Sequence, residues 1–278
     1  MFRTRLISGI IIAVSIAVFT YFGGIWLLAL LMLASVRGMF ELYRATGVLA
    51  EGKRIDLITG IAYFFCIAYF AALYITGQAM FTVVSATVFF LLVLLAAYVF
   101  TFPKYDAKQI AFTFFGFFYV GVMISFYYLT RSTEHGIFIV WLILAGSWLC
   151  DVFAYLTGMT LGRHKLAPVL SPKKSIEGSV GGIVLPALIA LAYGYIISRY
   201  YDPGYPVAPV FAILTAAGAA ASQIGDLSAS AVKRNFGIKD YGELIPGHGG
   251  VLDRFDSLIF TAPIIYFIAV LLIGGSIK

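Results

Sequence analysis

The sequence predicts an all-α polytopic integral membrane protein with about nine transmembrane helices. Of its 278 residues, 62% are hydrophobic and only 12% are charged, whereas about 25% of residues are charged in soluble domains. Apolar runs that approach or exceed the roughly 20 residues needed to cross a bilayer recur along the whole chain. Lysine and arginine gather in alternate loops, as the positive-inside rule describes for membrane proteins. These observations exclude an ordinary soluble fold.

The predicted helices are separated by short intervals that contain glycine, proline or charged residues. We expect helices at about 6–22, 25–46, 57–77, 79–101, 109–130, 137–161, 179–199, 208–231 and 252–275. The first follows Met-Phe-Arg-Thr-Arg, which resembles the charged start of a signal peptide. No small-residue cleavage pattern follows it, so we expect a retained first helix.

The distribution of basic residues predicts how these helices cross the membrane. Fourteen of them fall on one predicted side: Arg3, Arg5, Lys53, Arg54, Lys104, Lys108, Arg163, Lys165, Lys173, Lys174, Lys233, Arg234, Lys239 and Arg254. Arg131, Arg199 and Lys278 fall on the other side. Because basic loops stay in the cytoplasm, we expect a cytoplasmic N-terminus and a C-terminus on the opposite side, in the inner membrane of a bacterium.

Motif-like polar loops occur only in the second half of the chain. We therefore divide it into an N-terminal region 1–130, with about five spans and no catalytic motif, and a C-terminal catalytic membrane region 131–278. The latter has about four spans and two cytoplasmic loops, 162–178 and 232–252. The long polar interval from Ser222 to Asp256 is the first place to look for chemistry.

Several functional classes receive no support. The net charge of +6 is not gathered in one basic domain, so no nucleic-acid partner is expected. Cys66 and Cys150 lie in apolar runs without metal-like spacing, which is typical of packing residues. No inverted repeat of broken helices supports a transporter architecture, and no Walker or dinucleotide-binding pattern is present.

Four aspartates at or near membrane depth are candidate functional residues. Asp151 and Asp226 lie about 18 and 10 Å inward of the basic loop ends at 1.5 Å per residue. Asp253 and Asp256, three residues apart, project from one helix face. Oxygen ligands without cysteine favour Mg²⁺, so Asp226, Asp253 and Asp256 are candidate metal ligands, with Asp151 as a further one. The simpler alternatives are an interhelical hydrogen bond or salt bridge for Asp151 and for Asp226, and interaction with the positive helix N-terminus for Asp253 and Asp256.

Basic and glycine-rich segments flank these acids. A Ser-x-Glu-Gly turn begins at Ser175 and opens a helix, and the Gly-His-Gly-Gly segment at 247–250 leads into the last helix. Helix N-termini and glycine loops bind phosphate through backbone N–H groups. The cationic and loop residues that we expect to contact phosphate are Lys173, Lys174, Ser175, Lys233, Arg234, Lys239, His248, Gly249, Gly250 and Arg254. Together with Mg²⁺ they predict a nucleotide or polyphosphate site for phosphoryl or nucleotidyl transfer.

The same residues resemble the signature of the phosphatidate cytidylyltransferases, also called CDP-diacylglycerol synthases. The matching positions are Ser228, Val232-Lys233-Arg234, Lys239-Asp240, Gly242, Pro246, His248-Gly249-Gly250 and Asp253-Arg254-x-Asp256, and the loop Ser-Pro-Lys-Lys-Ser-x-Glu-Gly is similar to one in that family. No position of the motif departs from the pattern. The first half of the chain, to about residue 130, resembles the family only in hydropathy.

This resemblance implies a Mg²⁺-dependent nucleotidyltransferase of phospholipid biosynthesis that makes CDP-diacylglycerol and pyrophosphate from CTP and phosphatidic acid at the cytoplasmic face. The implied catalytic residues are Asp226, Asp253, Asp256, Lys233, Arg234 and His248, with potassium as a candidate second cation. The alternatives are a CTP-dependent polyprenol or phytol kinase and, from another class, a cation transporter. Small-residue helix faces also make a homodimer a candidate assembly.

Overall fold

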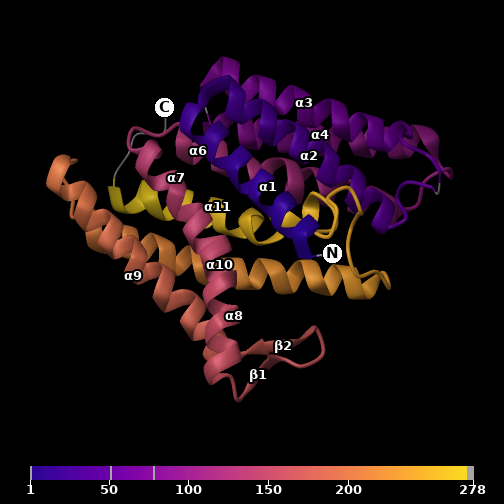
Figure 1. Ribbon diagram of the computed structural model, residues 1–278. Coiled ribbons are helices and arrows are strands. Elements are labelled where there is room, and N and C mark those ends of the chain that lie inside the picture. Colours follow the sequence, from indigo (N-terminus) through magenta and orange to yellow (C-terminus); the bar gives the residue numbers. More distant parts are fainter. Residues whose placement is uncertain (1, 51, 78, 274–278) are drawn as a thin grey trace. The chain divides into compact units, whose positions relative to one another are not determined.

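The computed structural model describes residues 2–50, 52–77 and 79–273, with side chains from residue 7 onward, and most of these residues are helical. In chain order the elements (Figure 1) are α1 Phe2–Phe22, α2 Gly24–Ala45, α3 Leu57–Thr76, α4 Ala79–Thr101, α5 Ala107–Gly116, the π-helical segment η1 Phe117–Val122, α6 Met123–Arg131, α7 Gly136–Leu144, the π-helical segment η2 Ala145–Leu149, α8 Cys150–Leu161, β1 Lys165–Ala167, β2 Ser171–Ser175, α9 Ile176–Tyr200, α10 Val207–Asn235 and α11 Leu252–Ile273.

The predicted all-α membrane architecture is confirmed. Within the described residues, eight helical segments are long and apolar enough to cross a membrane, and Ile7–Phe22 of α1 is a shorter apolar helix. Two of the eight segments are composite: Ala107–Arg131 contains η1, and Gly136–Leu161 contains η2. The observed helix ends lie close to the predicted ones because glycine, proline and capping residues mark them, as Asp56 does for α3 and Asp106 for α5.

The chain forms two compact units. Unit 1 comprises residues 1–128 and 236–254, and unit 2 comprises 129–235 and 255–276, apart from the last residues of the chain. One boundary falls in α6, near the expected division at residue 130. The loop 232–252, however, was expected with the C-terminal region, and most of it groups with the N-terminal helices. The reason lies in two long-range hydrogen bonds: Ser8 of α1 donates to the Pro246 carbonyl, and Glu41 of α2 accepts the Leu252 N–H.

Unit 1 is held by buried aromatic rings and by hydroxyl groups that find partners inside it. Phe90 of α4 packs on Phe117 of η1 with ring centroids 4.4 Å apart. The Tyr43 hydroxyl donates to the Thr113 carbonyl at 2.8 Å. In a membrane helix, such an internal partner removes the cost of leaving a polar group in hydrocarbon. Helices α2 to α5 thus form a packed scaffold.

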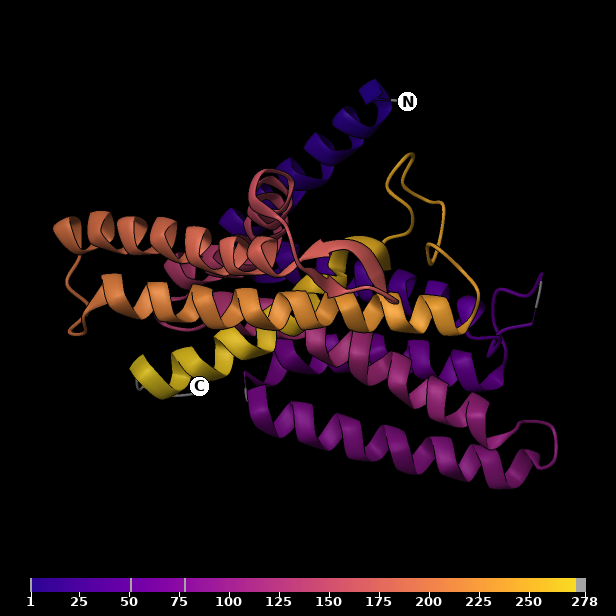
Figure 2. The same ribbon diagram turned by 90° about the horizontal axis from the view of Figure 1, so that it is seen from below.

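Unit 2 is built on close contacts between small residues. Helix α9 packs against both α8 and α10, as Figures 1 and 2 show. Gly182 of α9 lies against Ala154 and Cys150 of α8, and Gly146 of η2 lies against Ala219 of α10. A Cβ at Gly182 would approach the Cys150 carbonyl to 2.9 Å. Small residues let helix backbones approach closely in membranes, and the run 216–222 of α10 serves that purpose here.

A short hairpin interrupts the helices of unit 2. Strands β1 and β2 pair antiparallel, with Lys165 opposite Ser175 and Ala167 opposite Ser171. The sequence predicted a loop in 162–178 and a helix start at Ser175. The helix start is confirmed, because the Ser175 hydroxyl accepts the Gly178 N–H at 3.1 Å and caps α9. The hairpin itself was not predicted, since its strands are too short and too polar to show alternation.

Candidate functional site

The predicted site residues fall into two groups, one in each unit. Unit 2 holds Asp151, Asp226 and Asp256 together with the lysines that face them. Unit 1 holds the loop 236–251, with Asp253 and Arg254 at the start of α11.

In unit 2, the carboxylate of Asp226 forms an ion pair with the ammonium group of Lys174. Asp226 lies on α10 and Lys174 on β2, and both side chains are 27% exposed. Successive side chains of a strand point to opposite sides, which explains why Lys174 is half-buried while Lys173 is exposed. The hairpin thus directs one of two adjacent lysines toward the helices.

A second ion pair is more deeply buried. Lys233 Nζ lies 3.7 Å from Asp256 Oδ2, and both side chains are 11% exposed. Lys233 follows Asp226 by two helical turns, so both project from one side of α10. Close approach of α10 to α11 is possible because a Cβ at Gly225 would lie 2.9 Å from the Asp256 carbonyl oxygen. Asp256 also accepts the Ser257 N–H at 2.8 Å.

Ser257 connects the third carboxylate to this group. Its hydroxyl lies 3.4 Å from Asp151 Oδ2 of α8 and 3.4 Å from Asp256 Oδ1. A hydroxyl has one hydrogen to donate, so these two long contacts are alternatives. Ser257 of α11 thus lies within hydrogen-bond distance of Asp151 of α8, which is compatible with the interhelical interpretation of Asp151.

The carboxylates in unit 2 have the donor chemistry that Mg²⁺ prefers. Within the described residues, no group of three or more His, Cys, Asp or Glu side chains is arranged to hold a metal ion by itself. Mg²⁺ does not need such a cage, because it usually binds one or two carboxylates, several waters and substrate phosphates. Asp226 and Asp256 fit that mode, and the neighbouring Lys174 and Lys233 supply charges suited to a polyphosphate.

In unit 1, Asp253 holds the motif loop through backbone hydrogen bonds. Its Oδ2 accepts the N–H groups of Tyr241 at 2.8 Å and Gly250 at 2.9 Å, and the residue is only 4% exposed. Gly249 has a φ of 81°, and a Cβ there would lie 2.9 Å from Asp253 Oδ2. Glycine is thus required by the conformation and by the nearby carboxylate, in addition to any approach of phosphate.

A buried glutamate from α2 completes the support of this loop. Glu41 is 1% exposed, and its Oε2 accepts the Leu252 N–H at 2.9 Å. Its Oε1 accepts from Arg37 Nε at 3.0 Å. Gly242 and Gly250 pack directly on this carboxylate, and a Cβ at Gly242 would lie 2.9 Å from Oε1. Side chains at these two positions would therefore displace Glu41.

His248 is oriented by α1. Its Nδ1 lies 2.8 Å from the Ser8 hydroxyl, which also donates to the Pro246 carbonyl at 3.1 Å. A hydroxyl group can both donate and accept, so Ser8 orients the ring through Nδ1 whichever ring nitrogen carries the proton. Such orientation suits a residue that contacts phosphate or transfers a proton.

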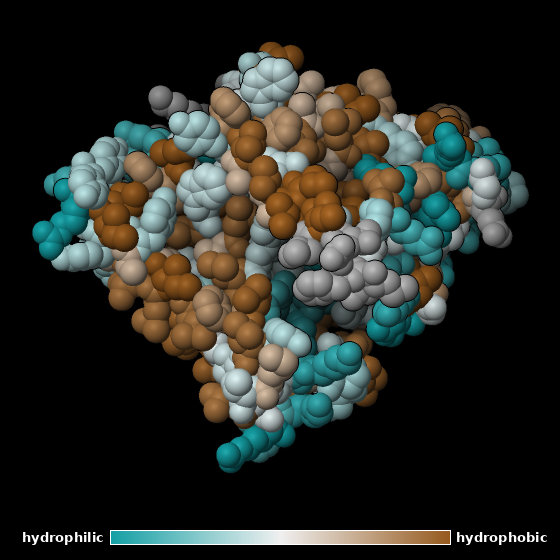
Figure 3. All heavy atoms as spheres, in the orientation of Figure 1, coloured by the Kyte–Doolittle hydropathy of each residue, from teal (hydrophilic) through white to brown (hydrophobic). Residues whose placement is uncertain are grey.

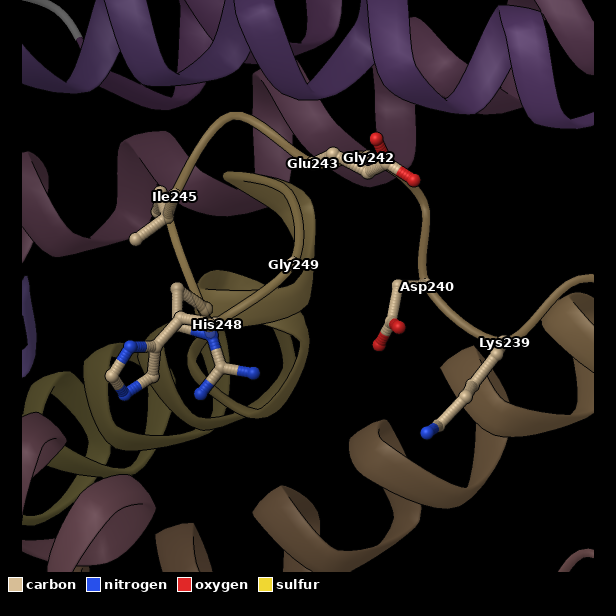
Figure 4. A pocket seen from close by; sticks show the side chains of 9 residues that line it. Lys239, Asp240, Gly242, Glu243, Ile245, His248 and Gly249 are labelled. Carbon is tan, nitrogen blue, oxygen red and sulfur yellow. The ribbon is translucent and has the colours of Figure 1, made fainter. Parts of the chain in front are cut away.

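The loop encloses a pocket of about 490 Å³ (Figure 4). Its lining residues are Lys239, Asp240, Gly242, Glu243, Ile245, Gly247, His248, Gly249 and Arg254. Figure 4 shows Lys239 and Asp240 on one wall and His248 with Ile245 on the other. The Nε of Arg254 is buried without a hydrogen-bond partner among the described atoms. A buried guanidinium nitrogen without an acceptor is costly, so the pocket has a donor suited to an anion.

The structure brings together some of the predicted residues and leaves others exposed. Asp226, Lys174, Lys233 and Asp256 form buried or half-buried pairs, whereas Lys173 and Arg234 are exposed. Sequence reasoning missed four supporting residues, Ser8, Arg37, Glu41 and Ser257. For Glu41 a signal existed: an acidic residue in an apolar helix, four positions after Arg37, is a functional or structural candidate.

Comparisons with known proteins agree with these motifs. A sequence model described as "Cytidylyltransferase family" matches residues 3–272. A protein of Staphylococcus aureus named phosphatidate cytidylyltransferase is 44% identical over 148 residues, which cover 53% of this chain and 54% of the relative. A Rickettsia bellii protein of the same name is 38% identical over 183 residues, covering 65% of this chain and 79% of the relative. The chain thus spans about half the length of the Staphylococcus relatives that it matches.

Proposed function

The chain belongs to the cytidylyltransferase family, and we propose that it is a phosphatidate cytidylyltransferase. It would transfer CMP from CTP to phosphatidic acid and yield CDP-diacylglycerol and pyrophosphate. The observation that carries this proposal is the name shared by relatives at 38 to 44% identity. The motif from Ser228 to Asp256 supports it independently.

The reaction needs alignment and charge neutralisation more than proton transfer. An oxygen of the lipid phosphate attacks the α-phosphorus of CTP, a new P–O bond forms, and the bond to the β-phosphate oxygen breaks to release pyrophosphate. A lipid phosphate monoester is largely dianionic at neutral pH, so it requires no general base. Cationic side chains that neutralise both substrates and hold them in line therefore supply much of the catalysis.

We assign these tasks to the paired and pocket residues. Lys174 and Lys233, held beside Asp226 and Asp256, would bind phosphate oxygens after rearrangement of their ion pairs. Arg254 and Lys239 line the pocket beside His248 and supply further donors. Ser175 caps α9 by accepting the Gly178 N–H and so fixes the end of β2, next to Lys174, on that helix.

We further propose that the enzyme depends on Mg²⁺, held by Asp226 and Asp256, with Asp253 and Asp151 as additional candidates. When bound, Mg²⁺ neutralises phosphate charge and polarises the phosphorus centre. The ammonium groups of Lys174 and Lys233 lie beside these two carboxylates. Asp253 and Asp151 are also engaged by backbone amides and by Ser257, respectively.

We place the site at the cytoplasmic face of a bacterial inner membrane. The support is the concentration of lysine and arginine on one predicted side of the spans and the bacterial source of the relatives. There a water-borne nucleotide and a membrane-embedded lipid phosphate could meet at headgroup depth, so the acyl chains would stay in the bilayer.

The test uses the purified full chain in lipid micelles or vesicles, with phosphatidic acid and CTP labelled at either the α- or the γ-phosphorus. We expect label in the lipid only from the α-position, together with release of pyrophosphate. Transfer of the γ-label to a polyprenol or phytol would identify a kinase instead. Mg²⁺ flux into liposomes in the absence of CTP, without any label transfer, would identify a transporter.

A further inference from the structure

The hairpin between α8 and α9 carries only basic charges. Between Gly162 and Ser175 the sequence has no aspartate or glutamate. Arg163, Lys165 and Lys173 are exposed, and none of them has an ion-pair partner among the described residues. Lys174 differs, because it pairs with Asp226. The hairpin therefore presents three uncompensated cations to its surroundings.

The base of the hairpin is firmly held. The Glu177 carboxylate accepts the backbone N–H groups of Arg163 at 3.0 Å and His164 at 3.2 Å, and it contacts His164 Nδ1 at 2.6 Å. The Ile176 N–H donates to the His164 carbonyl at 2.9 Å. The Glu177 carboxylate binds the backbone N–H of Arg163 and leaves the side chain of Arg163 free to extend. The exposed cations thus extend from a fixed base.

The tip of the hairpin is apolar. It consists of Pro168, Val169 and Leu170, and Val169 is 91% exposed. Leaving a large apolar side chain in water at the end of a fixed turn forgoes the gain from burying it. Contact with an apolar medium would recover that gain.

The position of the hairpin in the chain identifies that medium. It joins Gly136–Leu161 to Ile176–Tyr200, two consecutive helices long and apolar enough to span a membrane. A short connection between two such helices lies at a membrane–water interface. Figure 3 shows hydrophilic surface at the lower edge, where Figure 1 places β1 and β2, next to the hydrophobic surface of the adjoining helices.

We propose that this hairpin is an interfacial anchor for anionic lipids. Val169, with Pro168 and Leu170, enters the headgroup region of the bilayer, and Arg163 and Lys165 bind the phosphates of anionic lipids. Apolar insertion combined with basic side chains is the general mode of interfacial binding, and basic residues near an anionic surface are attracted to it. This inference concerns a surface outside the ion-paired group and does not depend on the reaction catalysed.

The test measures the depth of the tip directly. A spin label is attached to Val169→Cys in the full chain, in vesicles of phosphatidylcholine alone or of phosphatidylcholine and phosphatidylglycerol in equal parts. Cys66 and Cys150 are fully buried, and the parent protein treated in the same way gives the background. Collisions with oxygen, which partitions into lipid, are compared with collisions with a water-soluble nickel chelate. The reference position is Asp202→Cys, in the exposed loop at the other end of α9.

We expect the label at 169 to collide several-fold less with the chelate than the label at 202. This difference should be larger in the anionic vesicles. Adding Arg163→Gln and Lys165→Gln should remove the difference between the two lipid compositions, as should high salt, which screens charge. These two changes spare the backbone groups bound by Glu177 and leave Lys173 in place.

Equal chelate access at 169 and 202 in both compositions would overturn the proposal. Shielding of 169 that is the same with and without anionic lipid, and unchanged in the double variant, would overturn the assignment to anionic lipid. Transfer of the phosphorus label from CTP to lipid is measured separately. Loss of membrane anchoring is therefore distinguishable from loss of the proposed enzymatic activity.

Discussion

The motif loop of unit 1 and the ion-paired group of unit 2 use their acidic residues in different ways. Asp253 and Asp256 lie three residues apart at the start of α11, and both are buried. Asp253 accepts two backbone N–H groups of its own loop, whereas Asp256 lies beside the ammonium group of Lys233. These two aspartates thus lie in the same turn of α11 and are both buried, yet they have different partners.

This difference shows what backbone and side-chain partners each contribute. A carboxylate that accepts backbone N–H groups fixes the path of the chain, because those donors cannot rotate away. A carboxylate paired with a lysine stays available, since the long lysine side chain can move to a phosphate when substrate arrives. Unit 1 therefore supplies a preformed loop, and unit 2 supplies charges that can be redistributed.

The largest expected effect is in unit 2. Asp256→Asn or Asp226→Asn should lower turnover by about 10³-fold or more, because each removes a carboxylate proposed to hold the Mg²⁺ that neutralises the phosphates. Initial rates of label transfer from CTP measure this, with size-exclusion profiles as a check on folding. Asp202→Asn, in an exposed loop, is the matched control and should keep its rate. Substantial activity in Asp256→Asn would contradict the assignment.

A pair of variants at Asp253 separates loop support from charge. Asp253→Ala should leave two buried N–H groups without an acceptor, at about 1–3 kcal/mol each, and should open the loop 236–251 to limited proteolysis. Asp253→Asn retains an accepting oxygen, so we expect proteolytic protection close to that of the parent. We also expect it to lose turnover, because the metal-binding proposal needs the charge. Normal turnover in Asp253→Asn would restrict Asp253 to holding the loop.

Glu41 tests whether α2 is part of the loop support. Glu41→Ala leaves the Leu252 N–H and Arg37 without their partner, and should destabilise the protein by about 1–3 kcal/mol. Glu41→Gln keeps an oxygen for Leu252 and should lie closer to the parent. Thermal unfolding and the KM for CTP are measured on both. Identical unfolding temperatures and KM values for Glu41→Ala and the parent would refute the role of Glu41.

The smallest effect is expected at Ser8. Ser8→Ala removes one hydrogen bond to His248, worth about 1 kcal/mol, and should reduce kcat/KM only several-fold. Ser8→Thr keeps the hydroxyl and serves as the control. A Ser8→Ala enzyme with unchanged kcat/KM would show that the orientation of His248 does not matter for the reaction.

Much of this architecture was predictable because the features that mark membrane helices, hydropathy and capping residues, lie within short segments of the sequence. The span 57–77 was expected from hydropathy and is found at Leu57–Thr76. The helix start at Ser175 followed from the capping pattern alone. The candidate site residues were recognised for similar reasons, since charges at membrane depth and glycines before a helix are conspicuous in an apolar chain.

Other features lay beyond local patterns. Glu41 and Leu252 are 211 positions apart, and only the fold brings them into contact. The grouping of 236–254 with the N-terminal helices was missed for the same reason: the hydrogen bonds from Ser8 and Glu41 are long-range. The first half of the chain carries no motif, but it holds the motif loop of the second half.

The sequence by itself determined the membrane class, the position of the helices and the chemical type of the site, because hydropathy, capping and charge are properties of short segments. Only the tertiary structure decided which lysine pairs with which aspartate, why Gly249 and Gly250 must be glycine, and that Asp253 and Asp256 have different partners. Those features depend on contacts between groups that are far apart in the sequence. A pattern within a short segment does not specify such contacts.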